Sequence, residues 1–309
     1  MDKKLLKKYQ GSLLGLAIGD ALGVPIEFKK VGEFEPINDY IDLPGWFNLP
    51  AGHWSVDTAM ALCLANSLIE KKDFDPIDQI NRYKKWLEEG YCSSTGKAVG
   101  VGQTILRRLL TYRNEDNPYV EISPRHSEGN GSLMRLAPIP LYFRDNPKEA
   151  IKNAELSSKI THGSQLCSDA CKYYAGLIIG ALDGVPKEEL LSSLYCPIPD
   201  FWKENKLSEE IENVALGSFK HNHPPFIQGS GYVVKSMEAS LWAFYNSDSF
   251  EEGVLKAINL GDDADTTGAI YGQLAGAYYG IDGIPKKWID DLARNNEILN
   301  IASKLCKCG

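Results

Sequence analysis

The sequence predicts an all-α protein. Apolar residues recur three and four positions apart along most of the 309-residue chain, which is the spacing of one face of a helix. No stretch alternates apolar and polar residues as a strand would, and valine and isoleucine are not grouped with that period. No change in composition marks a linker. We therefore expect one compact orthogonal bundle of a dozen or more helices, forming a single domain over residues 1–309.

Composition and charge narrow the class of protein. A hydrophobic share of 43% and a charged share of 24% are typical of a soluble globular protein. A net charge of -8 argues against coating nucleic acid or binding a membrane surface, but it allows a phosphate-bearing small ligand. Seven cysteines without a paired CxxC set predict neither a zinc site nor a disulfide framework. The sequence opens without a signal-peptide cleavage pattern, so we expect a cytoplasmic protein. For the oligomeric state, a monomer is the simplest expectation.

The first predicted helix, residues 5–22, carries a glycine at every fourth position. This smooth stripe predicts close contact with another helix. Asp20 lies near the end of the helix, where its charge opposes the helix dipole. Glu27 follows Pro25 in an apolar setting, and it is either a desolvated general base or a surface carboxylate. The stripe consists of Gly11, Gly15, Gly19 and Gly23.

Two predicted helices begin at clusters of oxygen-bearing side chains. An apolar helix begins at Ser55, Asp57 and Thr58, and a second begins within residues 261–267, GDDADTT. A helix cap needs one side-chain oxygen, whereas the second cluster holds three carboxylates and two hydroxyls. Crowded carboxylates raise the pKa of one another, and a hard divalent cation would offset their charge. A solvated acidic turn is the alternative interpretation.

The middle of the chain contains two further points of chemical interest. Residues 129–135 read GNGSLMR, in which glycines would let backbone amides approach a phosphate, or would form an ordinary turn. His162 lies between two predicted helices and has either a structural or a catalytic role. Asp75 and Pro76 cap a helix over residues 76–88. Other helices are predicted over residues 103–112, 147–160, 164–182, 187–194, 207–219, 229–245, 250–259, 285–294 and 296–304.

Five ordered segments resemble the ADP-ribosylglycohydrolase family, and together they span nearly the whole chain. They are GSLLGLAIGDALGVPIEF, WSVDTAMALCLANSL, GNGSLMRLAPIPL, THG and NLGDDADTTGAIYGQLAGAYYG. The resemblance implies an all-α fold with two magnesium or manganese ions between two helix starts. It also implies hydrolysis of the N- or O-glycosidic bond that joins ADP-ribose to a modified protein side chain or small molecule.

The resemblance also implies roles for individual residues. Glu27 falls where the family has a glutamate near the bond that is cleaved. The positions that match metal ligands are Ser55, Asp57, Asp263, Asp265 and Thr266. Those that match the ADP-ribose site are Asn130, Gly131, Ser132, His162 and Tyr232.

Two residues depart from the family pattern. Val56 stands where the family has an aspartate ligand, and a valine side chain cannot coordinate a metal. One of the two ions is therefore expected to be weakened or lost. Gly100 stands where relatives have an aspartate near the substrate.

These departures leave more than one function open. The first is a metal-dependent hydrolase, and the second is a catalytically impaired relative that binds ADP-ribose or an ADP-ribosylated partner. A structural helical domain with incidental acidic caps is the third. We expect the loops 29–54 and 113–128 to select the acceptor that is released.

Overall fold

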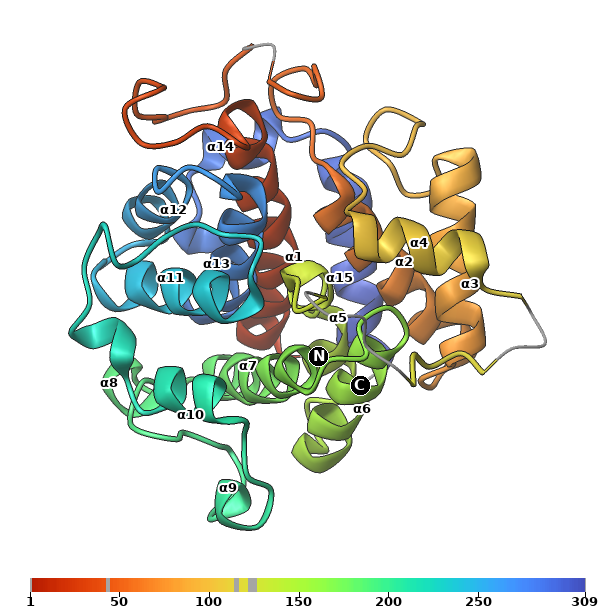
Figure 1. Cartoon of the computed structure of the whole chain (residues 1–309), viewed down its shortest axis with the longest axis vertical. Helices are drawn as coiled ribbons and strands as arrows, with labels where there is room; N and C mark the ends of the chain where they lie inside the picture. Colours follow the sequence, from red (N-terminus) through yellow and green to blue (C-terminus); the bar gives the residue numbers. More distant parts are fainter. Residues whose placement is uncertain (1, 43–44, 114–116, 122–126, 309) are drawn as a thin grey trace.

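Helices account for all the regular structure of the described chain. The computed structural model describes residues 2–42, 45–113, 117–121 and 127–308, so parts of both predicted rim loops, Pro44 included, lie outside the described residues. Within these ranges no strand occurs, and one isolated bridge pairs Gly129 with Tyr232. The predicted all-α fold is confirmed (Figure 1). The α-helices are α1 (Lys3–Gly23), α2 (Val56–Lys71), α3 (Pro76–Glu89), α4 (Gln103–Thr111), α5 (Pro138–Tyr142), α6 (Pro147–Lys159), α7 (Gln165–Asp183), α8 (Lys187–Leu190), α9 (Phe201–Glu204), α10 (Glu209–Ala215), α11 (Val233–Tyr245), α12 (Phe250–Ile258), α13 (Ala264–Tyr279), α14 (Lys286–Asp291) and α15 (Asn295–Cys308). Short 3₁₀ turns are η1 (Val24–Ile26), η2 (Asn130–Ser132), η3 (Ser218–Lys220) and η4 (Ile281–Gly283).

Helices α1 and α13 form the centre of the molecule and lie side by side (Figure 1). A Cβ placed on Gly272 would lie 1.9 Å from the carbonyl oxygen of Gly15, and one on Gly19 would lie 2.0 Å from that of Gly268. Only glycine permits this backbone approach, so the contact predicted from the glycine stripe is confirmed. Because the two helices run antiparallel, the end of α1 lies beside the start of α13.

Local sequence explains where most helices begin and end. Asp75 accepts hydrogen bonds from the amides of Ile77 and Asp78, with Pro76 at the first position of α3, as predicted. The helix predicted over 207–219 covers only α10, because Gly217 adopts a φ of +106°, which a helix residue cannot. The helix predicted over 187–194 likewise ends at Leu190, before a turn that continues to Leu194 with φ at +55°.

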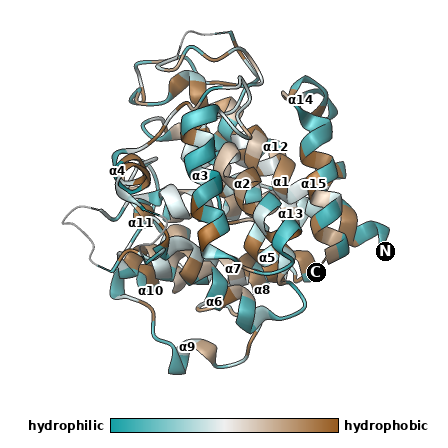
Figure 2. Cartoon of the chain, turned by 90° about the vertical axis from the view of Figure 1, so that its right-hand side faces the viewer, coloured by the Kyte–Doolittle hydropathy of each residue, from teal (hydrophilic) through white to brown (hydrophobic). Residues whose placement is uncertain are grey.

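The central helices lie in one hydrophobic core that side chains from α1 through α15 share. Outer helices such as α3 present mostly hydrophilic residues to the surroundings (Figure 2). The start of α1 and the end of α15 lie close together in both views (Figures 1 and 2). None of the described helices combines the length and apolar character needed to cross a bilayer. The short helices α5 and α9 were not predicted, since they are too short to show a period.

Candidate functional site

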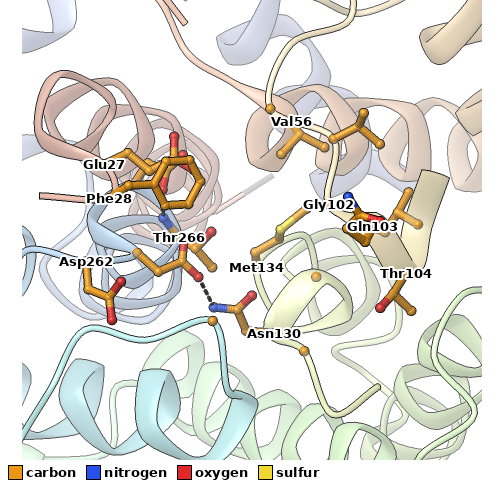
Figure 3. Close-up of a pocket in the computed structure, with 18 of the residues that line it drawn as sticks. Glu27, Phe28, Val56, Gly102, Gln103, Thr104, Asn130, Met134, Asp262 and Thr266 are labelled. Carbon is orange, nitrogen blue, oxygen red and sulfur yellow. Dashed lines mark hydrogen bonds between the residues drawn. The ribbon is translucent and has the colours of Figure 1, made fainter. Parts of the chain in front are cut away.

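A pocket of about 550 Å³ opens where the starts of α2 and α13 meet. Figure 3 shows Glu27 and Phe28 on one side of it and Val56 and Gln103 on the other. Its walls therefore come from segments that are far apart in the sequence. The described lining residues are Glu27, Phe28, Trp46, Phe47, Val56, residues 100–105, Gly129, Asn130, Gly131, Met134, His162, Gly231, Asp262, Asp263, Asp265 and Thr266.

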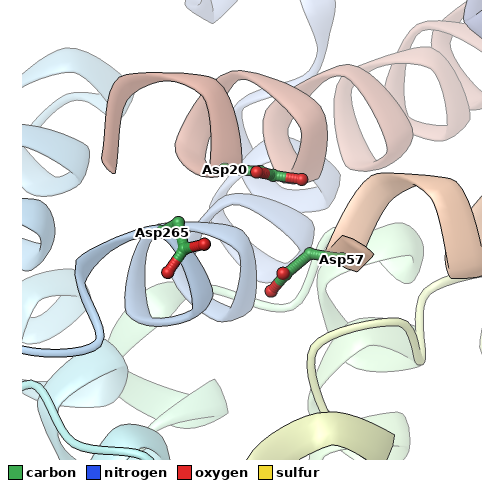
Figure 4. A group of neighbouring side chains, drawn as sticks. All are labelled: Asp20, Asp57 and Asp265. Atoms are coloured by element: carbon green, nitrogen blue, oxygen red, sulfur yellow. The ribbon is translucent and has the colours of Figure 1, made fainter. Parts of the chain in front are cut away.

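Three buried carboxylates from three helices meet beneath this pocket. Asp20 comes from α1, Asp57 from the first turn of α2 and Asp265 from the first turn of α13, and Figure 4 shows their carboxylates converging. One oxygen of each lies within 4.8 Å of the others. The Ser55 hydroxyl lies 3.1 Å from Asp57 Oδ2 and 3.3 Å from Asp265 Oδ2, so it can donate to either.

Asp20 is a site residue that the sequence did not identify as one. Its carboxylate accepts hydrogen bonds from the amide of Ser55 at 2.8 Å and the amide of Thr58 at 3.0 Å. The end of α1 thus supplies the cap of α2, whose own Ser55 makes no side-chain cap bond. The available signal was a single charged residue within an otherwise uncharged stretch, residues 11–26.

A second acidic group faces the pocket itself. Ligand oxygens of Glu27, Asp263 and Asp265 also lie within 4.8 Å of one another. Asn130 donates from Nδ2 to Asp263 Oδ2 at 2.6 Å, which orients that carboxylate (Figure 3). Burial, and then the charges of Asp265 and Asp263, raise the pKa of Glu27 to about 12. Buried Glu27 Oε2 has no hydrogen-bond partner among the described residues.

The electrostatics of the cluster call for a positive charge. Burial, followed by the nearby Asp20 and Asp265, holds the pKa of Asp57 well above its usual range. Burial and Asp263 do the same for the pKa of Asp265. None of the described residues lining the pocket is Lys or Arg, and Asp57 Oδ1 is buried with no partner in the described chain. Oxygen ligands without a neutralising side chain suit a hard divalent cation, so these residues fit one.

The end of the pocket away from the acidic cluster is formed by a glycine turn and a histidine. Gly131 lies against His162, since a Cβ on this glycine would be 3.0 Å from the imidazole Cε1. The turn is held from behind by buried Arg135, which donates to the Gly131 carbonyl at 2.7 Å and to the Thr161 hydroxyl at 2.7 Å. Burial, and then the charge of Arg135, lower the pKa of His162 to about 3. This end therefore offers a neutral imidazole beside a glycine turn.

Comparison with known proteins decides the family. A family model described as ADP-ribosylglycohydrolase matches residues 1–308. This chain belongs to the ADP-ribosylglycohydrolase family. It is 34% identical to "ADP-ribosylarginine hydrolase Tri1" of Pseudomonas putida, over 98% of this chain and 79% of that protein. It is 31% identical to "ADP-ribosyl-[dinitrogen reductase] glycohydrolase" of Rhodospirillum rubrum, over 91% of this chain and 89% of that one.

A solved structure supports the same assignment. A chain of an "ADP-ribosylglycohydrolase-related protein complex" is 36% identical and matches with a TM-score of 0.86, covering 99% of each chain. The predicted fold and enzyme class of this ADP-ribosylglycohydrolase are thereby confirmed. Its relatives act on ADP-ribosylated substrates.

The pocket of this ADP-ribosylglycohydrolase contains most, but not all, of the predicted site residues. Ser132 is buried behind the pocket, where its hydroxyl accepts from Ser158 Oγ at 2.8 Å. Tyr232 donates its hydroxyl proton to Glu210 at 2.6 Å. It borders an adjoining hollow that shares Gly129 and Gly231 with the main pocket. Ser55 and Asp57 lie beneath the pocket and not in its wall.

The two departures from the family pattern are neighbours in space. A Cβ on Gly100 would lie 3.4 Å from Val56 Cγ1 and 3.6 Å from the ring of Phe47. Gly100 has a φ of +81°, a conformation that an aspartate adopts only with strain. Val56 thus forms an apolar wall where the resemblance implies an aspartate ligand. A second ion would receive no oxygen from position 56 and would depend on the group of Glu27, Asp263 and Asp265.

Proposed function

We propose that this protein is a metal-dependent hydrolase that releases ADP-ribose from the side chain of arginine in a modified protein. The observation that supports it is that Glu27, with a buried and unpaired Oε2, borders the same pocket as Asp263, Asp265 and the Asn130 turn. An arginine acceptor is chosen because the name of the relative in Pseudomonas putida includes it, and 98% of this chain aligns with that protein.

The chain's own residues would each perform a defined task. Asp20, Asp57 and Asp265, together with Ser55 and Thr266, would hold a magnesium or manganese ion. When bound, such an ion would offset the carboxylate charge, allow Glu27 to ionise, and bind the ribose hydroxyls. The glycine turn beside His162 would bind the pyrophosphate through the backbone amide of Gly131, because the Asn130 amide already donates to the Gly231 carbonyl at 3.0 Å.

Hydrolysis then follows from where these groups lie. The oxygen of a water molecule bonds to the anomeric carbon of the ribose as the bond from that carbon to the guanidino nitrogen breaks. Glu27 accepts one proton from the water at Oε2 and passes it to the departing guanidino nitrogen, so no net proton is taken up or released. Because no described residue of the lining is Lys or Arg, positive charge that develops on the ribose is balanced by the carboxylates.

The test is ADP-ribose release from an ADP-ribosylarginine peptide in the presence of manganese. Glu27→Gln should lower kcat by about a hundredfold to ten-thousandfold, the range of general acid–base catalysis, and should still bind ADP-ribose. Glu35→Gln, the same change at an exposed position of the following loop, should keep wild-type kcat. Absence of release from arginine-, serine- and phosphate-linked substrates alike, with metal in excess, would overturn the proposal.

The same experiment tests the alternative function, in which the protein binds ADP-ribose or an ADP-ribosylated partner without hydrolysing it. Val56 favours this alternative because it lines the pocket without an oxygen ligand. If wild-type protein binds ADP-ribose without releasing it from any substrate, and Val56→Asp gains turnover, the binding role replaces the hydrolase.

A further inference from the structure

One end of the pocket is built from aromatic side chains that the proposed chemistry does not use. Phe28, Trp46 and Phe47 all line the pocket. Phe28 packs edge-on against Trp46, with ring centroids 5.9 Å apart, and against Phe47 at 6.3 Å. Yet Phe28 remains 54% exposed and Trp46 76% exposed. Large apolar side chains left open together at the mouth of a pocket point to a binding surface.

The base of this aromatic rim is held in a defined shape. Phe28 has a φ of +64°, which a bulky residue adopts only when its surroundings require it. Two backbone hydrogen bonds hold it, from the Phe28 amide to the Asp262 carbonyl at 2.6 Å and from the Asp262 amide to the Lys29 carbonyl at 2.7 Å. Asp262 is itself left-handed, with φ at +56°. The loop that carries Glu27 and Phe28 is thus joined to the loop that leads into α13.

The position of the rim relative to Glu27 decides which part of a substrate can reach it. Phe28 directly follows Glu27, and the two side chains lie next to each other in Figure 3. The glycine turn at Asn130 and Gly131, suited to phosphates, borders the pocket elsewhere, below Glu27 in that view. With the bond to be cleaved at Glu27 and the pyrophosphate at the turn, the group beyond the bond extends toward Phe28 and Trp46.

The charge of the mouth favours one chemical class of acceptor. Asp262 is exposed, lines the pocket and lies on the same side as Phe28 (Figure 3). The carboxylates of Asp262 and Glu27 both line the pocket, on the same side as Phe28 (Figure 3), and no Lys or Arg lines the described part of the pocket. A guanidinium is planar, permanently charged and weakly hydrated, so it stacks on aromatic faces and pairs with carboxylates. A serine hydroxyl or a phosphate would gain neither interaction.

We propose that Phe28 and Trp46, with Asp262 as the counter-charge, bind the guanidinium of the acceptor arginine and select it over uncharged acceptors. This inference rests on the proposed hydrolase function and names the residues that set its specificity. Asp262 acts here through charge at the mouth and not as a ligand of the buried cluster, since its side chain is exposed.

The test compares two peptides of one sequence, one ADP-ribosylated on arginine and the other on serine. Trp46→Ala and Phe28→Leu should each lower the ratio of kcat/KM for the arginine over the serine substrate by about fivefold to thirtyfold, the range of a cation–π contact. Asp262→Asn should lower the same ratio, and less so at high salt. Phe226→Ala changes an aromatic residue that is 75% exposed and does not line the pocket, so it should keep the wild-type ratio.

Binding measurements separate failure of the inference from failure of the proposed function. Titration of Glu27→Gln with the arginine peptide should give a Kd that the added Trp46→Ala change raises about tenfold, while the Kd for ADP-ribose changes less than about twofold. If both Kd results are obtained but wild-type protein hydrolyses neither peptide, the hydrolase proposal is wrong and the proposed role of the aromatic rim is supported. If wild type hydrolyses the arginine peptide and Trp46→Ala keeps the ratio, only the rim proposal falls. An equal loss of ADP-ribose affinity would assign the rim to the nucleotide and overturn the inference.

Discussion

Asp20, near the end of α1, caps helix α2 through Thr58. Its Oδ2 accepts from the Thr58 amide at 3.0 Å and from the Thr58 hydroxyl at 2.7 Å, and both residues are buried. These hydrogen bonds favour the ionised form, although burial still raises the pKa of Asp20. The end of α1 packs against the start of α13. The Asp20 hydrogen bonds therefore hold the start of α2 close to the start of α13. The geometry of the acidic cluster thus depends on this carboxylate.

Loss of this cap should be costly. Asp20→Ala leaves the buried amides of Ser55 and Thr58 without their acceptor, so we expect the free energy of unfolding to fall by about 2 to 4 kcal/mol. Asp2→Ala removes a cap at the exposed start of α1, where Asp2 accepts from the Lys4 amide at 2.9 Å. That control should cost about 1 kcal/mol or less. Urea unfolding measures the free energy of unfolding of both variants. Equal losses would show that the buried Asp20 cap stabilises the protein no more than the exposed Asp2 cap does.

A divalent cation should stabilise the protein, and position 56 should set how many ions bind. Manganese that binds only the folded chain raises the unfolding free energy by about 2.7 kcal/mol at a hundred times its Kd. Calorimetry should count one ion per chain for wild type and two for Val56→Asp, which restores a carboxylate at the pocket wall. Without metal, Val56→Asp should lower the melting temperature, because it adds charge to a crowded acidic group.

Val56→Asn is the matched control for that experiment. It supplies an oxygen without a charge, so it should bind one ion as wild type does. Two ions in wild type would mean that Val56 is tolerated at the second site. No ions in any of the three proteins would show that the buried carboxylates do not form a metal site.

The contact between α1 and α13 should not tolerate a methyl group. In Gly272→Ala the new Cβ would meet the Gly15 carbonyl oxygen at 1.9 Å, so the helices must separate. We expect a loss of about 3 kcal/mol or more in unfolding free energy, at the upper end of overpacking costs. In Gly176→Ala, within α7, the nearest contact is Pro197 Cδ at 3.3 Å, and a change within about 1 kcal/mol is expected. Similar thermal midpoints for both variants would contradict the close approach.

Protonation of His162 should contribute a loss of stability in acid. Its folded-state pKa of about 3 lies below the usual value near 6.5, so the unfolded chain binds the proton more tightly. The stabilising effect is complete above pH 6.5 and is lost as the pH falls from 6.5 toward 3. Between pH 7 and pH 5 this amounts to about 2 kcal/mol.

Urea unfolding at the two pH values measures this loss. Relative to wild type, His162→Gln should gain about 2 kcal/mol of unfolding free energy at pH 5 compared with pH 7, because the His162 contribution is removed. His221→Gln, a change at an exposed position, should keep the wild-type slope. An unchanged slope in His162→Gln would place the acid sensitivity elsewhere.

Short-range patterns were enough to predict most of the helices. The Asp75 cap, the proline after it and the glycine that ends α3 act over a few residues, so the sequence shows them directly. Short helices such as α5 and α9 left no period to detect, and the end of α8 depends on a turn whose Leu194 amide bonds to the Ala215 carbonyl. Helix boundaries that depend on such distant contacts carry no local signal.

For the site, residue types and local spacing were enough to predict two oxygen-rich helix starts, a glutamate after Pro25 and a glycine turn. That Val56 stands in place of a metal ligand followed only from the resemblance to the family. The folded structure was needed to show that Asp20 caps α2, that Ser132 is buried behind the pocket, and that Phe28 and Trp46 meet at its mouth. The physical reason is that each of these depends on contacts between segments distant in the chain, and on which face of a helix or loop becomes buried. The close glycine contact between α1 and α13 is what brings those segments together.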